Sequence, residues 1–200
     1  GACTNTLEDN WDYLHKNNYI YTKKLAIFCA RKNIKLIYAS SASVYGKSSG
    51  FQDEINNIDN FKTLNLYAKS KLKFDKFLIK NFKSNAKIIG LRYFNVYGSR
   101  EGLKKNMCSP IYNFTKQIIK NRFCKIFGAF DNYEAGNHTR DFVYVKDCVK
   151  LNIWLMNKKI NKLNIFNTGS GSTASFNLIA KEIIKNIGYG KIKYIKFPNE

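Results

Sequence analysis

The stretch Lys35-Leu36-Ile37-Tyr38-Ala39-Ser40-Ser41 is a short apolar run that ends in two serines. An apolar run of this length without polar alternation is typical of a strand buried on both faces, as in a parallel sheet. Apolar residues at helical spacing lie on either side of it, in residues 7–32 (one or two helices) and 66–82. A buried strand between amphipathic helices predicts an α/β protein.

Strands and helices continue to alternate along the rest of the chain. A polar loop is expected from residue 46 to about residue 60. Further strands are expected at residues 87–94, 142–145, 163–167 and 191–197. Further helices are expected at residues 109–121, 146–157 and 175–187. This alternation favours the α/β class with a parallel sheet.

The formal net charge of +20 at pH 7 would suit a protein that binds nucleic acid or an anionic membrane. However, the 29 lysines far outnumber the 5 arginines and are spread along the whole chain. Lys, Asn and Ile all have A/T-rich codons, and together they fill 76 of the 200 positions. Codon bias therefore accounts for the charge without a dedicated polyanion site.

Several protein classes are excluded by composition. Hydrophobic residues make up 44% of the chain, which argues against disorder. No apolar run approaches the ~18 residues of a membrane span, and no signal-peptide pattern is present. The five cysteines are odd in number and form no Cys-x-x-Cys pair, which argues against a disulfide scaffold or a zinc ribbon and favours a reducing compartment. His15 and His138 have no suitable companions, so no metal site is expected.

Tyr67 and Lys71 form a Tyr-x-x-x-Lys pair whose side chains share one face of the second expected helix. A lysine ammonium beside a phenol lowers the phenol's pKa from ~10, so that tyrosine can act as a general acid/base. Of the Tyr-x-x-x-Lys pairs in the chain, only Tyr67/Lys71 comes one loop after a buried strand that ends in serines. Open α/β sheets place their active sites at such strand ends. The chain contains four matches in all: Tyr19/Lys23, Tyr67/Lys71, Tyr112/Lys116 and Tyr189/Lys193.

Three other features have two interpretations each. Residues Gly169–Ala174 match the dinucleotide fingerprint G-x-G-x-x-A, but an ordinary strand-to-helix turn is the favoured interpretation. Arg92 and Arg140 suit bidentate phosphate binding, with structural ion pairing or surface solvation favoured for either one alone. The acidic pair Asp53-Glu54 is interpreted as part of a solvated loop rather than a catalytic pair.

Three motifs, in this order and spacing, carry a resemblance to a known family. They are Ser40-Ser41-Ala42-Ser43-Val44-Tyr45-Gly46, Tyr67-Ala68-Lys69-Ser70-Lys71 and Arg92-Tyr93-Phe94-Asn95-Val96-Tyr97-Gly98. Together they resemble the extended short-chain dehydrogenases/reductases. The resemblance implies a Rossmann-like, doubly wound parallel sheet and a smaller, discontinuous α/β substrate domain.

Within that superfamily the sequence most resembles the ADP-L-glycero-D-manno-heptose 6-epimerases, over essentially all 200 residues. The segments that carry this are Gly1-Ala2-Cys3, Asn17-Asn18-Tyr19, residues 93–104 and Arg140-Asp141-Phe142-Val143-Tyr144-Val145. Dehydratases of the superfamily usually carry an acidic pair after the strand serine or threonine. Ala42-Ser43 stand there in this chain, so elimination chemistry is disfavoured.

The resemblance implies a role for each matching residue. Tyr67 would be the first acid/base, Lys71 would lower its pKa, and Ser41 would hydrogen-bond the reacting oxygen. Lys104 would be a second acid/base on the opposite face of the substrate. Cofactor contacts would be made by Gly1, Ala2, Cys3, Thr4, Asn17, Tyr67, Lys71, Val96 and Lys104. Substrate contacts would be made by Asn95, Asn106, Asn113, Phe127 and Arg140, with Arg140 suited to a diphosphate. Asn106 and Asn113 depart from the Ser and His that are common in relatives.

The resemblance also implies a domain plan. Residues 1–95 would be part of an NADP-binding Rossmann domain, and residues 141–162 would return to it. Residues 96–140 and, mainly, 163–200 would form the two parts of the substrate domain, which places Gly169–Ala174 on the substrate side. The start at Gly1 without a methionine is expected to mark an excerpt from a longer protein, with the Gly-rich phosphate loop upstream.

The implied reaction inverts carbon six of ADP-D-glycero-β-D-manno-heptose by transient oxidation and re-reduction with tightly bound NADP. It would serve lipopolysaccharide core synthesis in the cytoplasm, in a homo-oligomer with neither nucleic-acid nor membrane partners. The runner-up is another nucleotide-sugar epimerase, such as UDP-glucose 4-epimerase. A basic nucleic-acid-binding module and a paralogue that binds without turnover are also compatible with the sequence.

Overall fold

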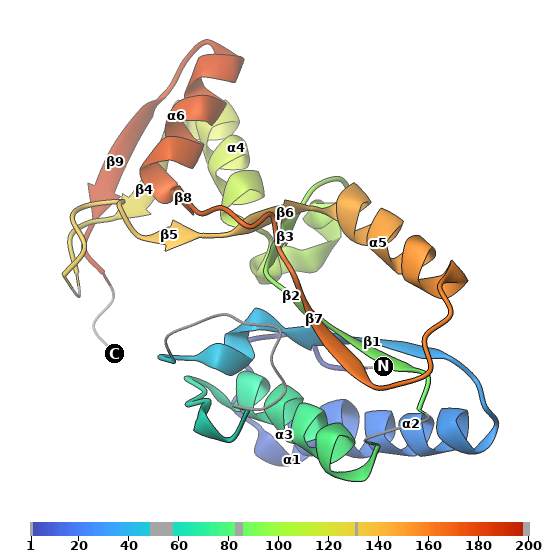
Figure 1. Cartoon of the computed structure of the whole chain (residues 1–200). Coiled ribbons are helices and arrows are strands. Elements are labelled where there is room, and N and C mark those ends of the chain that lie inside the picture. The colour runs from blue at the N-terminus through green and yellow to red at the C-terminus, as the bar shows by residue number, and fades with distance from the viewer. Residues whose placement is uncertain (1, 49–57, 83–85, 131, 198–200) are drawn as a thin grey trace. The chain divides into compact units, whose positions relative to one another are not determined.

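The computed structural model describes residues 2–48, 58–82, 86–130 and 132–197 and divides the chain into two compact units (Figure 1). Unit 1 comprises Gly1–Phe94 and Val149–Thr168, and unit 2 comprises Asn95–Cys148 and Gly169–Glu200. Gly1 and the Asp53-Glu54 pair lie outside the described residues.

Unit 1 is built on a three-stranded parallel sheet in the order β1-β2-β7. The strands are β1 (Leu36–Ser41), β2 (Ile88–Tyr93) and β7 (Asn164–Thr168). All three run in the same direction, so their carboxyl ends lie at one edge of the sheet. The apolar runs predicted to form buried parallel strands do so, which confirms the α/β class.

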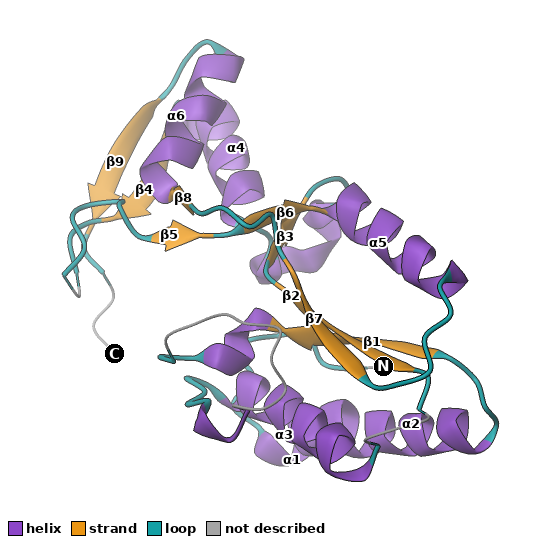
Figure 2. Cartoon of the chain, viewed as in Figure 1, coloured by secondary structure: helices purple, strands orange, loops and turns teal. Residues whose placement is uncertain are grey.

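Helices cover both faces of this sheet (Figure 2). One face is covered by a continuous helical stretch near the N-terminus and by α3. The other face is covered by α5. The helices are α1 (Trp11–Leu14), the π-helical turn η1 (His15–Ile20), α2 (Tyr21–Arg31), α3 (Leu66–Asn81) and α5 (Val145–Asn157). Two short 3₁₀ helices, η2 (Ala42–Tyr45) and η3 (Ile58–Asn60), lie between β1 and α3.

Successive side chains of β2 point to opposite faces and therefore enter two different cores. Ile88 packs with Phe74 and Leu78 of α3. Ile89 and Leu91 pack with residues of α5, chiefly the buried Leu155. A strand with an apolar residue at each of these positions must be covered on both sides, which is why the sheet is doubly wound.

The described part of unit 2 contains three pairs of strands and two longer helices. Its parallel pairs are β3 (Asn95–Tyr97) with β6 (Phe142–Tyr144) and β4 (Phe123–Phe127) with β9 (Lys191–Ile195). Its antiparallel pair is β5 (Thr139–Arg140) with β8 (Ala174–Ser175). Its helices are η4 (Glu101–Met107), α4 (Pro110–Asn121) and α6 (Phe176–Ile187). The core of unit 2 forms where α4, β4 and α6 meet, around Ile118, Ile126 and Ala180.

The bounds of the two compact units differ from those of the domain plan expected from the sequence. That plan assigns residues 163–168 mainly to the second part of the substrate domain, but β7 pairs with β2 and so lies in unit 1. It also assigns residues 141–148 to the Rossmann domain, but β6 pairs with β3 and these residues lie in unit 2. Asn95, the first residue of β3, belongs to unit 2 for the same reason.

Candidate active site

Tyr67, Lys71 and Asp75 follow one another at one-turn spacing along one face of α3. The helix begins there because the Asn65 side chain caps it, accepting a hydrogen bond of 2.8 Å from the backbone N–H of Ala68. Tyr67 is 9% exposed, Lys71 8% and Asp75 0%. This face of α3 is therefore a buried row of three ionisable groups.

The last four residues of β1 each meet this row. The Tyr38 hydroxyl and the Ser40 hydroxyl both donate to the Asp75 carboxylate at 2.9 Å. The Lys71 ammonium donates to the carbonyl oxygen of Ala39 at 2.9 Å. Ser41 forms a side-chain hydrogen bond with the Tyr67 phenol. The serine-terminated strand and the Tyr-x-x-x-Lys helix are thus brought together at the carboxyl end of a parallel strand, as the sequence predicts.

Arg92 belongs to the same buried network and is not available to a phosphate. It is 1% exposed, and its Nε donates to Asp75 at 3.3 Å. Its Nη1 donates to the Tyr45 hydroxyl at 3.0 Å, and that hydroxyl donates to the Asn167 side chain at 2.6 Å. Of the two interpretations of Arg92, structural ion pairing is confirmed and phosphate binding is wrong.

Burial controls the protonation of this centre. It raises the pKa of Tyr67 above the usual value of 10.0, while the hydrogen bond with Ser41 lowers it and Cys3 adds to the rise. Burial also lowers the pKa of Lys71, against the influence of Asp75 and Cys3. The Lys71 Nζ lies 5.8 Å from the centre of the Tyr67 ring. Tyr67 is therefore protonated at neutral pH, and the lowering of its pKa by Lys71 stays a prediction.

The segment around Cys3 is held beside Tyr67 and Lys71 by Asn18, a residue that the sequence analysis gives no role. Asn18 is buried, accepts from the Cys3 backbone N–H at 2.7 Å and donates to the Cys3 carbonyl at 3.2 Å. It also donates to Ser70 of α3 at 3.0 Å. Its neighbour Asn17, the expected cofactor contact, donates to the carbonyl of Tyr13 one helical turn earlier at 2.8 Å.

In unit 2, Asp141 organises the residues around Asn95. The Asp141 carbonyl accepts from both the backbone N–H and the side-chain amide of Asn95, at 3.0 and 3.1 Å. The Asp141 carboxylate accepts from the backbone N–H groups of Ser170 and Gly171, at 2.7 and 3.0 Å. The N–H groups of the G-x-G-x-x-A match are therefore bound to a carboxylate of the chain itself, in keeping with the favoured interpretation as a strand-to-helix turn.

The other expected contacts of unit 2 lie on several of its elements. Val96 is in β3, and Phe127 ends β4. Lys104 and Asn106 are exposed on η4. Asn113 of α4 donates to the carbonyl of Cys108 at 3.1 Å. Arg140 is exposed in β5, and its guanidinium donates to the Thr139 carbonyl at 2.8 Å.

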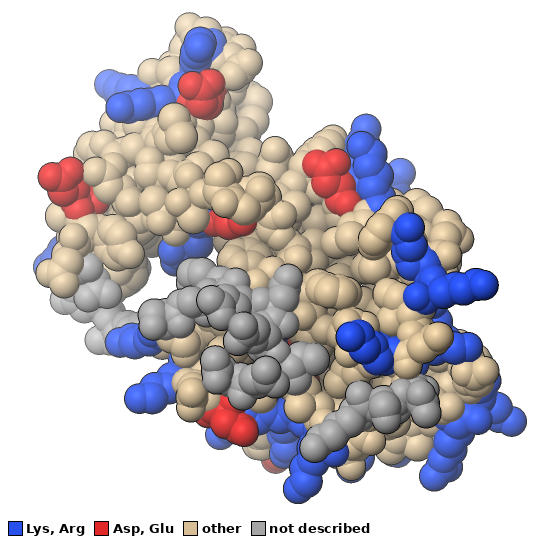
Figure 3. All heavy atoms as spheres, in the orientation of Figure 1, with Lys and Arg blue, Asp and Glu red and all other residues tan. Residues whose placement is uncertain are grey.

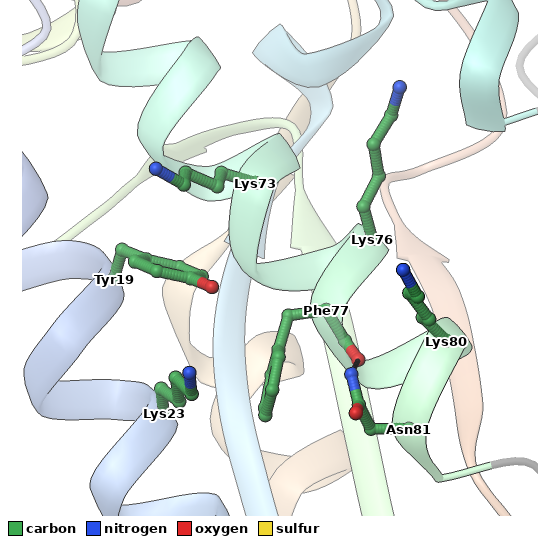
Figure 4. Close-up of a pocket in the computed structure, with 7 residues that line it drawn as sticks. All are labelled: Tyr19, Lys23, Lys73, Lys76, Phe77, Lys80 and Asn81. Carbon is green, nitrogen blue, oxygen red and sulfur yellow. Dashed lines mark hydrogen bonds between the residues drawn. The ribbon is translucent and has the colours of Figure 1, made fainter.

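A shallow pocket of about 370 Å³ lies between α3 and the η1–α2 stretch of unit 1 (Figure 4). Its lining residues are Tyr19, Lys23, Lys73, Lys76, Phe77, Lys80 and Asn81. Lys23 Nζ lies 4.9 Å from the Phe77 ring centre, and Lys73 Nζ lies 4.7 Å from that of Tyr19. Tyr19 and Lys23, one of the Tyr-x-x-x-Lys matches, thus take part in cation–π contacts that line this pocket. None of the candidate catalytic residues lines it.

The basic charge is dispersed on the visible face of the molecule (Figure 3). Lys and Arg side chains occur there at many separate places rather than in one continuous block. No described helix is long and apolar enough to cross a membrane. Within the described ranges, no group of three or more His, Cys, Asp or Glu side chains is placed to hold a metal ion.

Residues 1–169 match the family model described as the NAD dependent epimerase/dehydratase family. Two curated relatives bear the name ADP-L-glycero-D-manno-heptose-6-epimerase. The one from Alkalilimnicola ehrlichii is 40% identical over 199 residues, which are 99% of this chain and 61% of the relative. The one from Brachyspira hyodysenteriae is 41% identical over 203 residues, covering 100% of this chain and 61% of the relative. The chain thus spans less than two thirds of the length of these relatives.

Solved structures agree with these matches. The crystal structure of Helicobacter pylori ADP-L-glycero-D-manno-heptose-6-epimerase gives a TM-score of 0.85 at 32% identity, covering 98% of this chain and 59% of that one. The UDP-N-acetylglucosamine 4-epimerase from Methanobrevibacter ruminantium, in complex with UDP-N-acetylmuramic acid, gives a TM-score of 0.79 at 26% identity. That match covers 100% of this chain and 63% of the other.

Proposed function

The chain belongs to the NAD dependent epimerase/dehydratase family, and from this premise we propose that its activity is that of an ADP-L-glycero-D-manno-heptose 6-epimerase. The proposed reaction inverts carbon six of ADP-D-glycero-β-D-manno-heptose. The observation that carries the proposal is the buried contact of Ser41, Tyr67 and Lys71 at the carboxyl end of β1. The two relatives of that name, 40% and 41% identical over nearly all of this chain, support the choice of substrate.

A nicotinamide dinucleotide, NADP in this proposal, would supply reversible oxidation and reduction at carbon six when bound. The residues present fit such a group. Lys71 uses one of its three N–H donors on the Ala39 carbonyl, which leaves donors for ribose hydroxyls. Cys3 lies close enough to raise the pKa of both Tyr67 and Lys71, so the segment expected to contact the cofactor is beside them. Ala2, Cys3, Thr4, Asn17, Val96 and Lys104 are the other described residues proposed to hold the cofactor.

Tyr67 is proposed to move the proton of the carbon-six hydroxyl. The ionised form, the phenolate, accepts that proton when the carbon is oxidised, and the phenol so formed returns a proton when the carbonyl is reduced. Ser41, already hydrogen-bonded to the phenol, orients the same oxygen. Lys71 stabilises the phenolate through its positive charge, because an opposite charge near an acid favours the ionised form.

Lys104 is proposed as the second acid/base. The epimerase removes hydride from one face of the carbon and returns it to the other, so the oxygen takes two orientations, and an acid/base on each side puts one within hydrogen-bond reach of each. Lys104 is exposed on η4 and supplies an amine for the second orientation.

The substrate contacts are proposed to lie in unit 2. Because the Asn95 amide donates its NH₂ group to the Asp141 carbonyl, its Oδ1 is oriented as an acceptor for a sugar hydroxyl. The exposed guanidinium of Arg140 matches the diphosphate in charge and geometry. Phe127, Asn106 and Asn113 complete the proposed set. We further propose a cytoplasmic homo-oligomer that serves lipopolysaccharide core synthesis.

The test uses the protein at its natural full length. It is incubated with ADP-D-glycero-β-D-manno-heptose, and in parallel with UDP-glucose, and the epimers are resolved by chromatography. The proposal predicts a mixture of the two carbon-six epimers and unchanged UDP-glucose. Conversion of UDP-glucose without conversion of the heptose would replace the proposal with a UDP-glucose 4-epimerase activity. Salt-dependent binding of mixed-sequence DNA without either conversion would favour a nucleic-acid-binding module.

A further inference from the structure

Residues 98–109 of unit 2 form a segment whose two ends are joined by one buried side chain. Glu101 is 3% exposed. Its Oε1 accepts from the backbone N–H of Gly98 at 2.9 Å and from the Ser109 hydroxyl at 2.8 Å. Its Oε2 accepts from the backbone N–H of Ser109. The carboxyl group therefore connects the residue after β3 with the residue before α4.

The start of this segment contains two residues with positive φ. Gly98 has a φ of +146°, and a Cβ there would lie 2.5 Å from Val145 Cγ1. Arg100 has a φ of +69°, a left-handed conformation that is uncommon for a residue with a side chain. Cys108 adds a second link by donating its thiol to the Glu101 carbonyl at 3.0 Å. Glu101 links this start of the segment to Ser109 at its other end.

The far end of the segment is itself anchored. Ser109 is the N-cap of α4, and its hydroxyl accepts from the Tyr112 backbone N–H at 3.2 Å. Because Glu101 binds Ser109 through both its hydroxyl and its N–H, η4 is attached to the start of a twelve-residue helix. Lys104 lies between these anchors, three residues after Glu101 in η4.

We propose that Glu101 is a positioning residue for Lys104. The inference rests on the proposed function, in which the Lys104 amine must reach the substrate oxygen. A lysine side chain has large rotamer freedom, so its reach is defined only if its backbone is fixed. Misplacement of a reacting group by about 1 Å can cost ~100-fold in rate. Glu101 acts on catalysis through the backbone of η4, without contact to substrate or cofactor.

The kinetic test is a double-mutant cycle between Glu101→Gln and Lys104→Met in the full-length protein. Glutamine keeps the shape of the side chain but presents an NH₂ group where Glu101 accepts from N–H donors. Glu101→Gln is expected to lower kcat at least about tenfold with little change in KM. In the Lys104→Met background the same substitution is expected to change kcat less than about twofold, because residues that act as a unit are non-additive.

The matched control is Glu134→Gln, an exposed glutamate of unit 2 that accepts from Asn137 at 2.9 Å. Its kcat is expected to equal that of the wild type. The proposal is overturned if Glu101→Gln leaves kcat unchanged. It is equally overturned if Glu101→Gln lowers kcat by the same factor whether or not Lys104 is present, since the effect would then not pass through Lys104.

A second readout does not depend on activity. Trypsin cleaves after Arg100, Lys104 and Lys105, all within the segment, and limited digestion followed by mass spectrometry reports how often the segment opens. Cleavage at these sites is expected to be at least about fivefold faster in Glu101→Gln and unchanged in Glu134→Gln. Equal cleavage in all three proteins would overturn the proposal. If wild type does not epimerise the heptose, the proposed function fails, and the digestion still decides whether Glu101 fixes the segment.

Discussion

Tyr67, Lys71 and Asp75 form the buried row on α3, and each meets a different part of the end of β1. Tyr67 and Lys71 could be predicted because their spacing, and the serine-terminated strand before them, are visible in the sequence. Asp75 could not, because a carboxylate in a lysine-rich helix is indistinguishable from a solvated one. The only sequence signal is its position one turn after Lys71, and its partners Tyr38 and Arg92 come from distant segments.

Replacing Asp75 by asparagine is predicted to destabilise the protein by about 3–5 kcal/mol, because it leaves the buried Arg92 charge without its partner. The control is Asp59→Asn, which breaks the exposed Lys76–Asp59 pair at 2.8 Å and should cost at most about 1 kcal/mol. Urea denaturation of both variants measures the difference. A loss for Asp75→Asn as small as that for Asp59→Asn would contradict the network as described.

His138 is predicted to make stability depend on pH. It is 4% exposed among aromatic rings, and both ring nitrogens lack a hydrogen-bond partner among the described residues. Burial lowers the pKa of His138, and Arg140 adds to the effect. The folded protein therefore disfavours the charged form, whereas the unfolded chain takes up a proton near pH 6.5.

Stability should accordingly decline as pH falls below about 6.5, by at most ~1.4 kcal/mol per pH unit from this group. His138→Phe removes the titrating group and should flatten the profile between pH 7 and pH 5. Denaturation midpoints measured across that range give the comparison. If the stability of His138→Phe falls with pH as steeply as that of the wild type, His138 is not the source of the pH dependence.

At the scale of elements, the Gly169–Ala174 turn matches a cofactor-binding motif in sequence, but in the structure a side chain of the protein binds its N–H groups. The motif follows β7 and precedes α6, as a cofactor loop would. The N–H groups of Ser170 and Gly171 nevertheless bind the carboxylate of Asp141, the residue after β5, and β5 pairs with β8. The pattern of glycines is visible in the sequence, but the carboxylate that fills the turn lies about thirty residues away and could not be predicted from spacing.

Gly169→Ala is predicted to destabilise the protein by about 1–3 kcal/mol, since the added Cβ would lie 2.4 Å from the Asp141 carboxylate. Gly128→Ala is the matched control, because its Cβ would meet only the Ile195 carbonyl at an ordinary 3.4 Å. Denaturant unfolding of the two alanine variants tests the difference. Equal stabilities of Gly169→Ala and Gly128→Ala would contradict the tight packing of Gly169 against the Asp141 carboxylate.

Strand β4 is the longest of the strands that were not expected from the sequence, the others being β3, β5 and β8. Phe123-Cys124-Lys125-Ile126-Phe127 has only one polar residue, and its short length after a helix conceals its strand character. Its partner β9 lies more than sixty residues further along the chain. The buried Cys124 and Ile126 pack on α4 and α6, and this long-range packing, rather than local propensity, selects the strand.

At the scale of the molecule, the chain passes between the two units three times, at residues 94–95, 148–149 and 168–169. The α/β class and the discontinuous second domain could be anticipated from alternation and family resemblance. The boundaries could not, because hydrogen bonding places β7 beside β2 and β6 beside β3. On the face shown in Figure 3, the basic side chains that give the +20 charge are dispersed rather than gathered in one block.

The central claim is that Tyr67 moves the proton in a carbon-six epimerisation. It is tested most directly by the rate of epimer formation from ADP-D-glycero-β-D-manno-heptose in full-length wild type, Tyr67→Phe and Tyr19→Phe. Tyr19→Phe is the control, because Tyr19 belongs to another Tyr-x-x-x-Lys match on the surface of unit 1. We predict at least a ~100-fold loss of rate for Tyr67→Phe, with retained nicotinamide cofactor, and no loss for Tyr19→Phe. A Tyr67→Phe protein that epimerises at the wild-type rate would contradict the account.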